Sequence, residues 1–221
     1  MGRIILYHGS SNPVLIPQFG KGEDRHDYGK GLYLTPNIDL AKEWSVCTGD
    51  NEVGYVFKIE IDEDQYKVLN FDSLTTLHWL AELMSHRPAD SKSARYRRLA
   101  PIFIKKYKYP NVDKYDVIKG WRANASYFSI VKRFVRDEID VELIPELFGL
   151  GDLGIQYCIK SERAFAGLAR EYYPVIEVDA DTYYKKYIGK DVAAREMISR
   201  IIESEQNTMT NVFSKYVREG S

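Results

Sequence analysis

Apolar runs of two kinds predict seven strands along the chain. The segment 53–61 alternates large apolar residues with smaller or charged ones, which is the two-residue period of a half-buried strand. Shorter apolar runs, bounded by Gly, Pro, Asn or Asp, are typical of further strands. The runs of the second kind cover residues 3–7, 32–34, 66–71, 115–118, 155–159 and 174–178.

Apolar residues three and four positions apart predict helices between the strands. One helix is expected to begin with Thr35 as N-cap and Pro36 in the first helical position, where proline's missing N–H is not needed. A second is expected to follow a cap at 72–73. The segment 141–150 fits either assignment. Further helices are predicted over 93–107, 123–136 and 191–205, and from Ser161 onward.

The mixed order of strands and helices predicts an α+β fold of one domain, residues 1–221. A helical segment of about residues 72–110 is expected as an insertion, and about 180–221 as a C-terminal helical extension. Residues 11–30 are rich in Gly, Pro and charge and are expected to form a long loop. A loop of that length in a compact domain is usually functional or disordered.

Composition and charge narrow the function classes. The 31 Lys and Arg residues against 32 Asp and Glu give a net charge of -1, which excludes a globally basic nucleic-acid binder. Cys47 and Cys158 lack a CxxC partner, so neither a zinc site nor a disulfide framework is predicted, and no metal is expected. The apolar run at 3–7 is too short for a signal sequence or a membrane span. A cytoplasmic protein is therefore expected, with delivery into another cell left open.

Two polar segments carry the candidate chemistry. In the segment YHGS, His8 stands at the mouth of the first predicted strand. In the segment DYGKGLYLT, Tyr33 follows Gly29 and Gly31, which would remove side chains where the backbone passes close to a ligand. Each residue alone has a plain interpretation, because a strand-end His is usually a surface residue and a lone Tyr usually belongs to a core. Their joint occurrence in order favours a binding pocket.

The chain also resembles a known family. Four fragments carry the resemblance, in the order YHGS, DYGKGLYLT, AKEW and GIQYCIKS. They are similar to the H-Y-E branch of ADP-ribosyltransferases, the group of diphtheria toxin and the poly(ADP-ribose) polymerases. The resemblance covers roughly residues 3–47 and 112–170, and the most similar pattern is a bacterial branch known only as a domain of unknown function. It implies a split β-sheet core flanked by helices, and a pocket that takes NAD as substrate.

The resemblance assigns a role to each candidate residue. His8 would hold the adenosine-side ribose, and Gly9 would bind the nicotinamide carboxamide through its backbone. Tyr33 would stack on the nicotinamide ring, and Trp44 falls where the family often places a second aromatic on the other face. Gln156 falls at the third, usually acidic, position. The implied sites are catalytic His8, Tyr33 and Gln156 and, for NAD binding, His8, Gly9, Ser10, Gly31, Tyr33 and Trp44.

The chemistry of NAD cleavage gives these residue types a physical reason. The reaction passes through an oxocarbenium-like ribosyl cation, so the site needs orientation and electrostatic stabilisation more than nucleophiles. Tyr33 and Trp44 would fix the leaving nicotinamide between them. A carboxylate at position 156 would hold the ribose 2′-OH and stabilise the cation, whereas the amide of Gln156 keeps the hydrogen bond without the charge. We therefore expect slow turnover, mono- rather than poly-ADP-ribosylation, or lost activity.

The predicted function is an NAD-dependent mono-ADP-ribosyltransferase, a glycosyltransferase that moves ADP-ribose to a macromolecular acceptor and releases nicotinamide, as a bacterial toxin or effector would. Two alternatives stay open. One is an NAD glycohydrolase with water as acceptor, and the other is a non-catalytic module that binds NAD or ADP-ribose. The acceptor could be protein or nucleic acid, an antitoxin or regulatory partner is compatible with the role, and no membrane partner is expected.

Three further segments bear on partners. Basic and aromatic residues interleave over 95–109, which could hold a nucleic-acid strand by phosphate contacts and stacking; a solvated helix face is the competing interpretation. Phe148 and Leu150, within 145–154, lie where the implied family keeps a target-recognition loop. Ser126 stands where members of the bacterial branch carry an acid.

Overall fold

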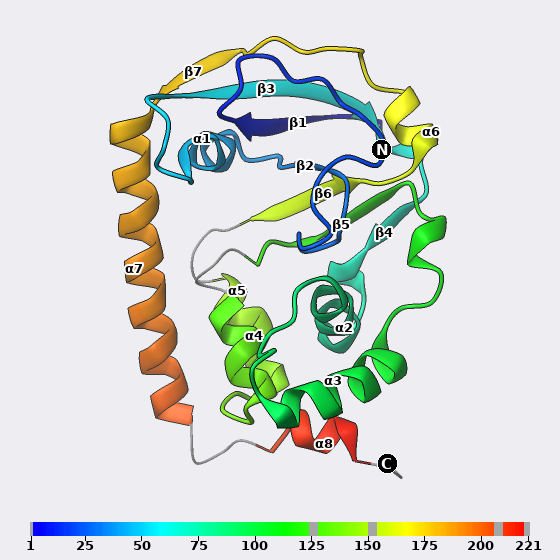
Figure 1. Ribbon diagram of the computed structural model, residues 1–221, viewed down its shortest axis with the longest axis vertical. Helices are drawn as coiled ribbons and strands as arrows, with labels where there is room; N and C mark the ends of the chain where they lie inside the picture. The colour runs from blue at the N-terminus through cyan, green and yellow to red at the C-terminus, as the bar shows by residue number, and fades with distance from the viewer. Residues whose placement is uncertain (1, 124–127, 150–153, 206–209, 219–221) are drawn as a thin grey trace.

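The protein folds as two β-sheets with helices packed around them (Figure 1), which confirms the α+β class. The computed structural model describes residues 2–123, 128–149, 154–205 and 210–218. The first sheet is antiparallel, with the order β1-β3-β7. Its strands are β1 (Arg3–Ser10), β3 (Val53–Asp62) and β7 (Ile176–Asp179). The second sheet has the order β2-β6-β5-β4, in which only β4 and β5 pair in parallel. Its strands are β2 (Leu32–Leu34), β6 (Ile155–Ile159), β5 (Val117–Trp121) and β4 (Val68–Asn70).

Within the described residues the strand predictions are confirmed in place; β2 and β6 have the predicted ends, and the other strands begin or end differently. β1 continues to Ser10, through residues expected to form a turn, because Gly9 and Ser10 still pair with β3. The segments 66–71 and 174–178 contain only the short strands β4 and β7. An edge strand that pairs with a single neighbour needs few residues, and its hydrophobic pattern says little about where pairing stops.

A pair of backbone hydrogen bonds joins the two sheets near the ends of β1 and β2. Tyr7 N donates to Thr35 O at 2.8 Å, and Thr35 N donates back to Tyr7 O at 2.9 Å. The Thr35 hydroxyl also donates to Ile155 O in β6 at 3.2 Å. The sheets are therefore tied together one residue before His8, the first predicted site residue.

Helix α1 (Ile38–Val46) packs against the first sheet and begins later than predicted. Asn37 is its N-cap, and its side chain accepts hydrogen bonds from two backbone N–H groups of the first turn, at 2.9 and 3.2 Å. The assignment of Thr35 as N-cap and Pro36 as first helical residue is wrong, because Thr35 belongs to the bridge between the sheets. Asn is at least as good an N-cap as Thr. Because Asn37 lies two residues after Thr35, the chain can leave the sheet before the helix begins.

The remaining helices mostly follow the periodicity. They are α2 (Thr76–His86), α3 (Ala94–Tyr107), α4 (Phe128–Val135), α5 (Ile144–Gly149) and α6 (Glu162–Ala166). Ser161 caps α6 as predicted, accepting from Ala164 N at 3.0 Å. The cap at 72–73 is wrong, because Phe71–Ser73 forms a separate 3-10 turn and α2 starts after Thr75. The segment 141–150, which fitted either assignment, is helical where it is described. Residues 124–127 of the helix predicted over 123–136 lie outside the described residues.

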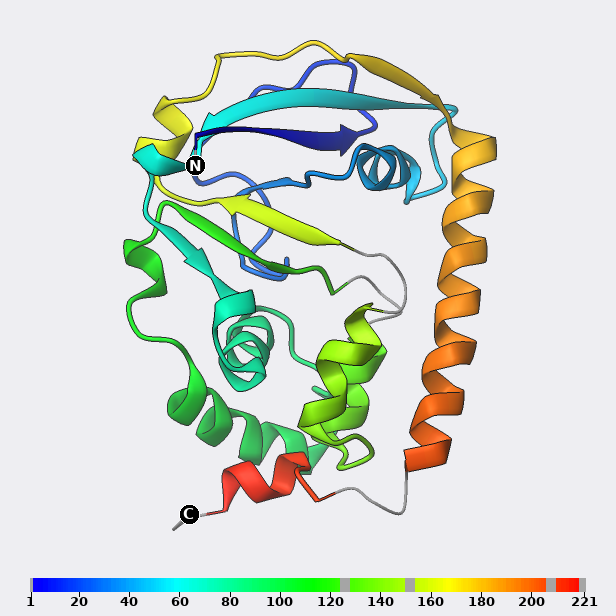
Figure 2. The ribbon, with the colours of Figure 1, turned by 180° about the vertical axis from the view of Figure 1, so that it is seen from behind.

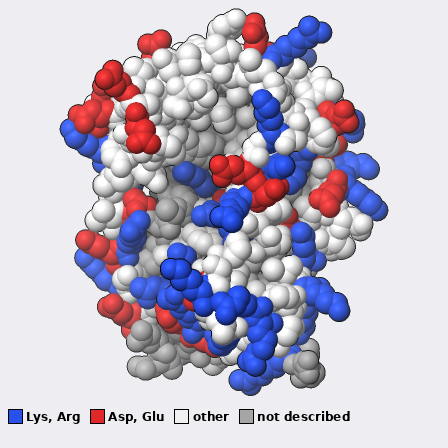
Figure 3. Space-filling model, viewed as in Figure 1, with Lys and Arg blue, Asp and Glu red and all other residues white. Residues whose placement is uncertain are grey.

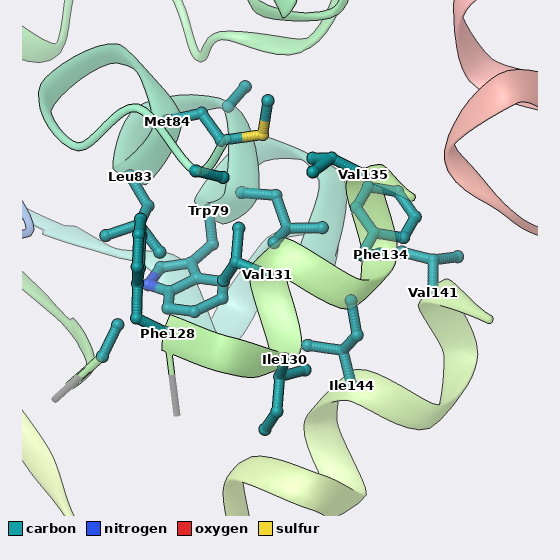
Figure 4. Close-up of a cluster of buried hydrophobic side chains, with 14 of the residues drawn as sticks. Trp79, Leu83, Met84, Phe128, Ile130, Val131, Phe134, Val135, Val141 and Ile144 are labelled. Carbon is teal, nitrogen blue, oxygen red and sulfur yellow. The ribbon is translucent and has the colours of Figure 1, made fainter. Parts of the chain in front are cut away.

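The largest core lies between the second sheet and the helices below it (Figure 4). Trp79 of α2 and Phe134 of α4 are fully buried there. Complete burial of one such side chain stabilises a fold by roughly 1.5–3 kcal/mol. A smaller core between the sheets contains Leu6 of β1, Leu34 of β2 and Phe57 of β3, and it holds the strands that carry the predicted site in fixed relation.

The C-terminal helices run down one side of the molecule and under it (Figures 1 and 2). Helix α7 (Ala180–Glu205) starts directly after β7, well before the helix predicted over 191–205 and at the start of the expected extension. Its first turns are mainly polar and aromatic, so they lacked the apolar period that marked the rest. Helix α8 (Phe213–Val217) places the fully buried Phe213 against Phe103 and Phe134. No helix in the described ranges is both long and apolar enough to cross a bilayer.

Candidate functional site

A pocket of about 520 Å³ lies where the two sheets meet. Five residues predicted from the sequence line it: His8, Gly31, Tyr33, Trp44 and Gln156. They come from β1, β2, α1 and β6, so elements distant in sequence build one site. Other described lining residues include Asp27, Arg87, Arg122 and Tyr187.

His8 ties β1 to β2 beyond the bridge. Its Nδ1 lies 2.8 Å from the carbonyl oxygen of Tyr33. Because a carbonyl can only accept, Nδ1 must carry the proton, and Nε2 of the neutral ring is then a free acceptor. Burial lowers the pKa of His8 below its ordinary value of 6.5, more than the hydrogen bond to Tyr33 raises it. At neutral pH the ring is therefore uncharged and can accept a hydrogen bond from a ligand hydroxyl.

Tyr33 is held rigidly by its hydroxyl. The hydroxyl donates to Gly29 O at 2.6 Å and accepts from Tyr28 N at 3.0 Å. Burial is the main reason that the pKa of this phenol lies far above its ordinary value, so it stays protonated. The ring of His26 lies beside it, with centroids 5.2 Å apart and planes inclined at 59°. Tyr33 thus offers the pocket an aromatic surface and not a reactive oxygen.

Trp44 is covered on one face by a cation. The Arg122 guanidinium carbon stands 4.7 Å from the centre of the Trp44 ring. Among the described residues, neither Arg122 Nη1 nor Trp44 Nε1 has a hydrogen-bond partner, although both atoms are buried. Burial lowers the pKa of Arg122, and a guanidinium nevertheless remains charged. A buried cation with a free donor, in a pocket also lined by Arg25 and Arg87, favours an anionic ligand.

Gln156 is buried beside the carboxylate of Asp27. Its Nε2 donates to Asp27 Oδ2 at 2.8 Å and to Trp121 O at 3.2 Å. Asp27 is only 6% exposed and forms an ion pair with Arg87. The sequence analysis missed Asp27, Arg87 and their link to Gln156. Asp27 stands inside the fragment DYGKGLYLT, so its position was available as a signal, whereas nothing marked Arg87, which follows a helix of the expected insertion.

The predicted binding residues Gly9 and Ser10 lie at the end of β1 and are not among the described residues that line the pocket. A Cβ at Gly9 would lie 1.9 Å from Ala41 O, so this glycine admits helix α1 against β1. A Cβ at Gly31 would lie 2.4 Å from Cys158 Sγ, which brings β2 close to β6. Gly29 has a φ of +73° and faces the ring of His86. For these glycines, chain packing and turn geometry explain the residue without a ligand.

The segments proposed for partner contacts fall in different places. Phe148 of α5 is buried, with its ring centroid 4.8 Å from that of Trp79, so it is a core residue and not part of a recognition surface. Leu150 and Ser126 lie outside the described residues. Lys and Arg side chains gather on the lower part of the face in Figure 3, where α3 lies. Arg98 and Lys105 are exposed there, whereas Arg95 is engaged by Asp137.

Neither cysteine is set up for chemistry. Cys158 is buried under β2, and burial raises the pKa of its thiol to about 12. Burial also raises the pKa of the Cys47 thiol. Within the described ranges, no three His, Cys, Asp or Glu side chains come together as metal ligands. The described side chains that line the pocket carry imidazole, aromatic, amide, carboxylate and guanidinium groups.

The fold and the pocket define an α+β protein whose pocket is lined by aromatic and cationic side chains. The chain belongs to the family described as protein of unknown function DUF3990, whose model matches residues 4–169. No curated protein and no solved structure matches the chain. The matched range contains the second sheet, β1 and β3 of the first sheet, and most of the pocket. It leaves out β7 and α7, and α7 contributes Tyr187 to the pocket.

Proposed function

We propose that this protein is an NAD-dependent mono-ADP-ribosyltransferase, built on an ADP-ribosyltransferase-like split sheet. The observation that carries the proposal is that His8, Tyr33 and Gln156, the three residues assigned by the resemblance, line one pocket from three strands of the two sheets. Three residues chosen without regard to the fold would rarely line the same pocket. The family description itself supplies no chemistry.

The charge of the pocket fits a dinucleotide. NAD carries a doubly charged pyrophosphate between two ribosyl groups, and arginine is the side chain best suited to hold it. Arg25, Arg87 and Arg122 line the pocket, and Arg122 has a buried donor free for a phosphate oxygen. A volume of about 520 Å³ is within the usual range for small-molecule sites.

The fixed tautomer of His8 fits the role given to it. A ribose hydroxyl can donate to the free Nε2, while Nδ1 stays bound to Tyr33 O. Tyr33, immobilised by two hydrogen bonds, would present its ring to the nicotinamide. Orientation of this kind contributes to catalysis because the reacting bond is held near its transition-state geometry.

In the proposed reaction, the bond between nicotinamide nitrogen and ribose C1′ breaks, and its electron pair leaves with nicotinamide. A nucleophile of the acceptor then bonds to C1′ and gives its proton to solvent. Gln156 can hold a ribose hydroxyl in this step but carries no charge to stabilise the cation. We therefore propose slow transfer of single ADP-ribose units. Protein and nucleic acid both remain candidate acceptors, and a cytoplasmic toxin or effector with an antitoxin is the proposed setting.

A non-catalytic NAD-binding module is the second candidate, favoured by the same neutral residue at position 156. Labelled NAD with lysate or nucleic acid separates the candidates. Label on a macromolecule supports transfer, free ADP-ribose supports an NAD glycohydrolase, and saturable binding without nicotinamide release supports the module. His8→Ala and Tyr33→Ala should each impair NAD use more than Gln156→Ala does. Absence of both NAD binding and nicotinamide release would refute the proposal.

A further inference from the structure

The side-chain amide of Gln156 has only one acceptable orientation. Its Nε2 faces Asp27 Oδ2 at 2.8 Å and Trp121 O at 3.2 Å, and both of these oxygens are acceptors. Turning the amide over would place Oε1 against a carboxylate and a carbonyl, and two donors would be lost. No described residue donates a hydrogen bond to Oε1. This oxygen is therefore the polar atom that Gln156 has left for the pocket.

The carboxylate that fixes Gln156 is itself fixed. Asp27 Oδ2 also accepts from Ala123 N at 2.8 Å, and Oδ1 accepts from Arg87. The guanidinium of Arg87 lies over the Phe128 ring at 4.2 Å, which holds its plane. Both oxygens of a buried acid are thus engaged by donors from distant parts of the chain. With an arginine paired to it and N–H donors at both oxygens, this carboxylate can only accept from Gln156.

We propose that Asp27 is the positioning residue of this site: its charge orients Gln156 so that a carbonyl oxygen, and not an N–H, meets the ligand, and it makes an acid at position 156 unfavourable. The proposal rests on the proposed function where it concerns the ribose, and on the structure alone where it concerns orientation. The resemblance implies a negative charge at position 156. In this proposal that charge belongs to Asp27, which contacts the ligand only through Gln156.

The other groups around Gln156 do not alter this assignment. The Tyr28 hydroxyl donates to Trp121 O at 2.9 Å and accepts from Trp79 Nε1 at 3.1 Å, and burial raises its pKa well above the ordinary value, so it stays neutral. The other charged side chains that line the pocket are Arg25, Arg87 and Arg122, of which Arg87 is engaged by Asp27. A second carboxylate at position 156 would therefore meet Asp27 at close range with no new cation beside it.

The stability of three variants tests the orientation without reference to activity. In Gln156→Glu, two carboxylates in contact can hold one proton between them at pH 5 but not at pH 8. We expect its Tm to fall by roughly 6 °C or more at pH 8 and much less at pH 5. The double variant Asp27→Asn/Gln156→Glu removes the like charge and should recover part of the loss at pH 8.

Gln65→Glu is the matched control, because Gln65 Nε2 also donates to an aspartate, Asp62 Oδ2, at 3.0 Å, but Gln65 is exposed. Its Tm should change little at either pH. Equal Tm values for Gln156→Glu and the native protein at pH 8, or a double variant no more stable than Gln156→Glu, would overturn the orientation.

Nicotinamide release and NAD binding by the same variants test the functional part. If the native protein releases nicotinamide, Gln156→Glu should release it no faster, and Asp27→Asn/Gln156→Glu should release it faster than Gln156→Glu. A faster Gln156→Glu enzyme would overturn the role of Asp27 and leave the proposed function standing. A native protein that neither binds nor cleaves NAD would remove the proposed function, while the Tm comparison would still decide the orientation.

Discussion

Gly9 offers a direct test of how the site is built, because its neighbour His8 lines the pocket while Gly9 itself faces helix α1. The perturbation is Gly9→Ala. The added Cβ would lie 1.9 Å from Ala41 O, 2.7 Å from Ser45 N and 3.0 Å from Ala41 C. All three atoms belong to the backbone of α1, so no side chain can rotate away.

The size of the effect follows from these distances. Real Cβ contacts essentially never fall below 3.0 Å, so β1 and α1 must separate by about 1 Å or more. Overpacking of a tight core typically costs 1–3 kcal/mol, and a clash between two backbones belongs at the upper end, at about 3 kcal/mol. For a chain of this length that corresponds to a fall in Tm of roughly 6–12 °C.

Thermal unfolding of the purified protein measures the change, and Gly189→Ala is the matched control. Gly189 lies in α7, and a Cβ there would meet nothing within 4 Å. The same substitution should therefore raise Tm slightly, since Ala is favoured over Gly in a helix by roughly 1 kcal/mol. A Gly9→Ala protein as stable as the native one would refute the packing role of Gly9 and return weight to a role in ligand binding.

Three further predictions concern the pocket and the surface. Because the folded-state pKa of His8 lies below 6.5, its neutral ring persists as pH falls to 6.5 and is lost only below that lowered pKa. NAD affinity measured by titration calorimetry should therefore stay constant from pH 8 to 6.5 and fall below it. A fall that begins above pH 7 would contradict the lowered pKa of His8. Arg122→Met should weaken NAD binding about tenfold or more, since a hydrogen bond to a charged group contributes about 1.5–3 kcal/mol. Arg98→Met on exposed α3 should leave NAD binding unchanged. Equal affinities of the two variants would exclude Arg122 as a ligand contact. If α3 binds nucleic acid, the Arg98→Glu/Lys105→Glu protein should lose salt-dependent binding of RNA or DNA. The control variant Lys185→Glu on α7 should retain that binding. Binding that is insensitive to salt would exclude a nucleic-acid-binding role for α3.

Local signals predicted the elements well and the contacts between them poorly. The alternation at 53–61 and the apolar spacing in 93–107 identified β3 and α3, because residues at those spacings are buried in the cores. The cap at Asn37 was missed because the Thr35–Pro36 pair is also a start signal, and only pairing between the sheets decides between the two. The start of α7 carried no apolar period and was missed for that reason.

The site shows the same division. His8, Tyr33 and Gln156 were identified because each stands in a distinctive short fragment, and all three line the pocket. The partners that determine their chemistry were not, since Asp27 and Arg87 are ordinary charged residues in a loop and after a helix. Their meaning depends on a contact between residues 27, 87 and 156, which no local pattern encodes. Sequence reasoning could name several groups that line the pocket but not the groups that hold them.

The geometry at the end of β1 explains why His8 is both a structural and a candidate binding residue. After the bridge between Tyr7 and Thr35, an antiparallel ladder would next pair Gly9 with Tyr33. Instead the His8 ring takes the Tyr33 carbonyl, and the strands can separate there without leaving that oxygen unpaired. The pocket therefore exists because a side chain replaces a backbone bond. The same replacement leaves the other ring nitrogen of His8 without the Tyr33 contact, so the opening of the sheet and the polarity of the pocket follow from one contact.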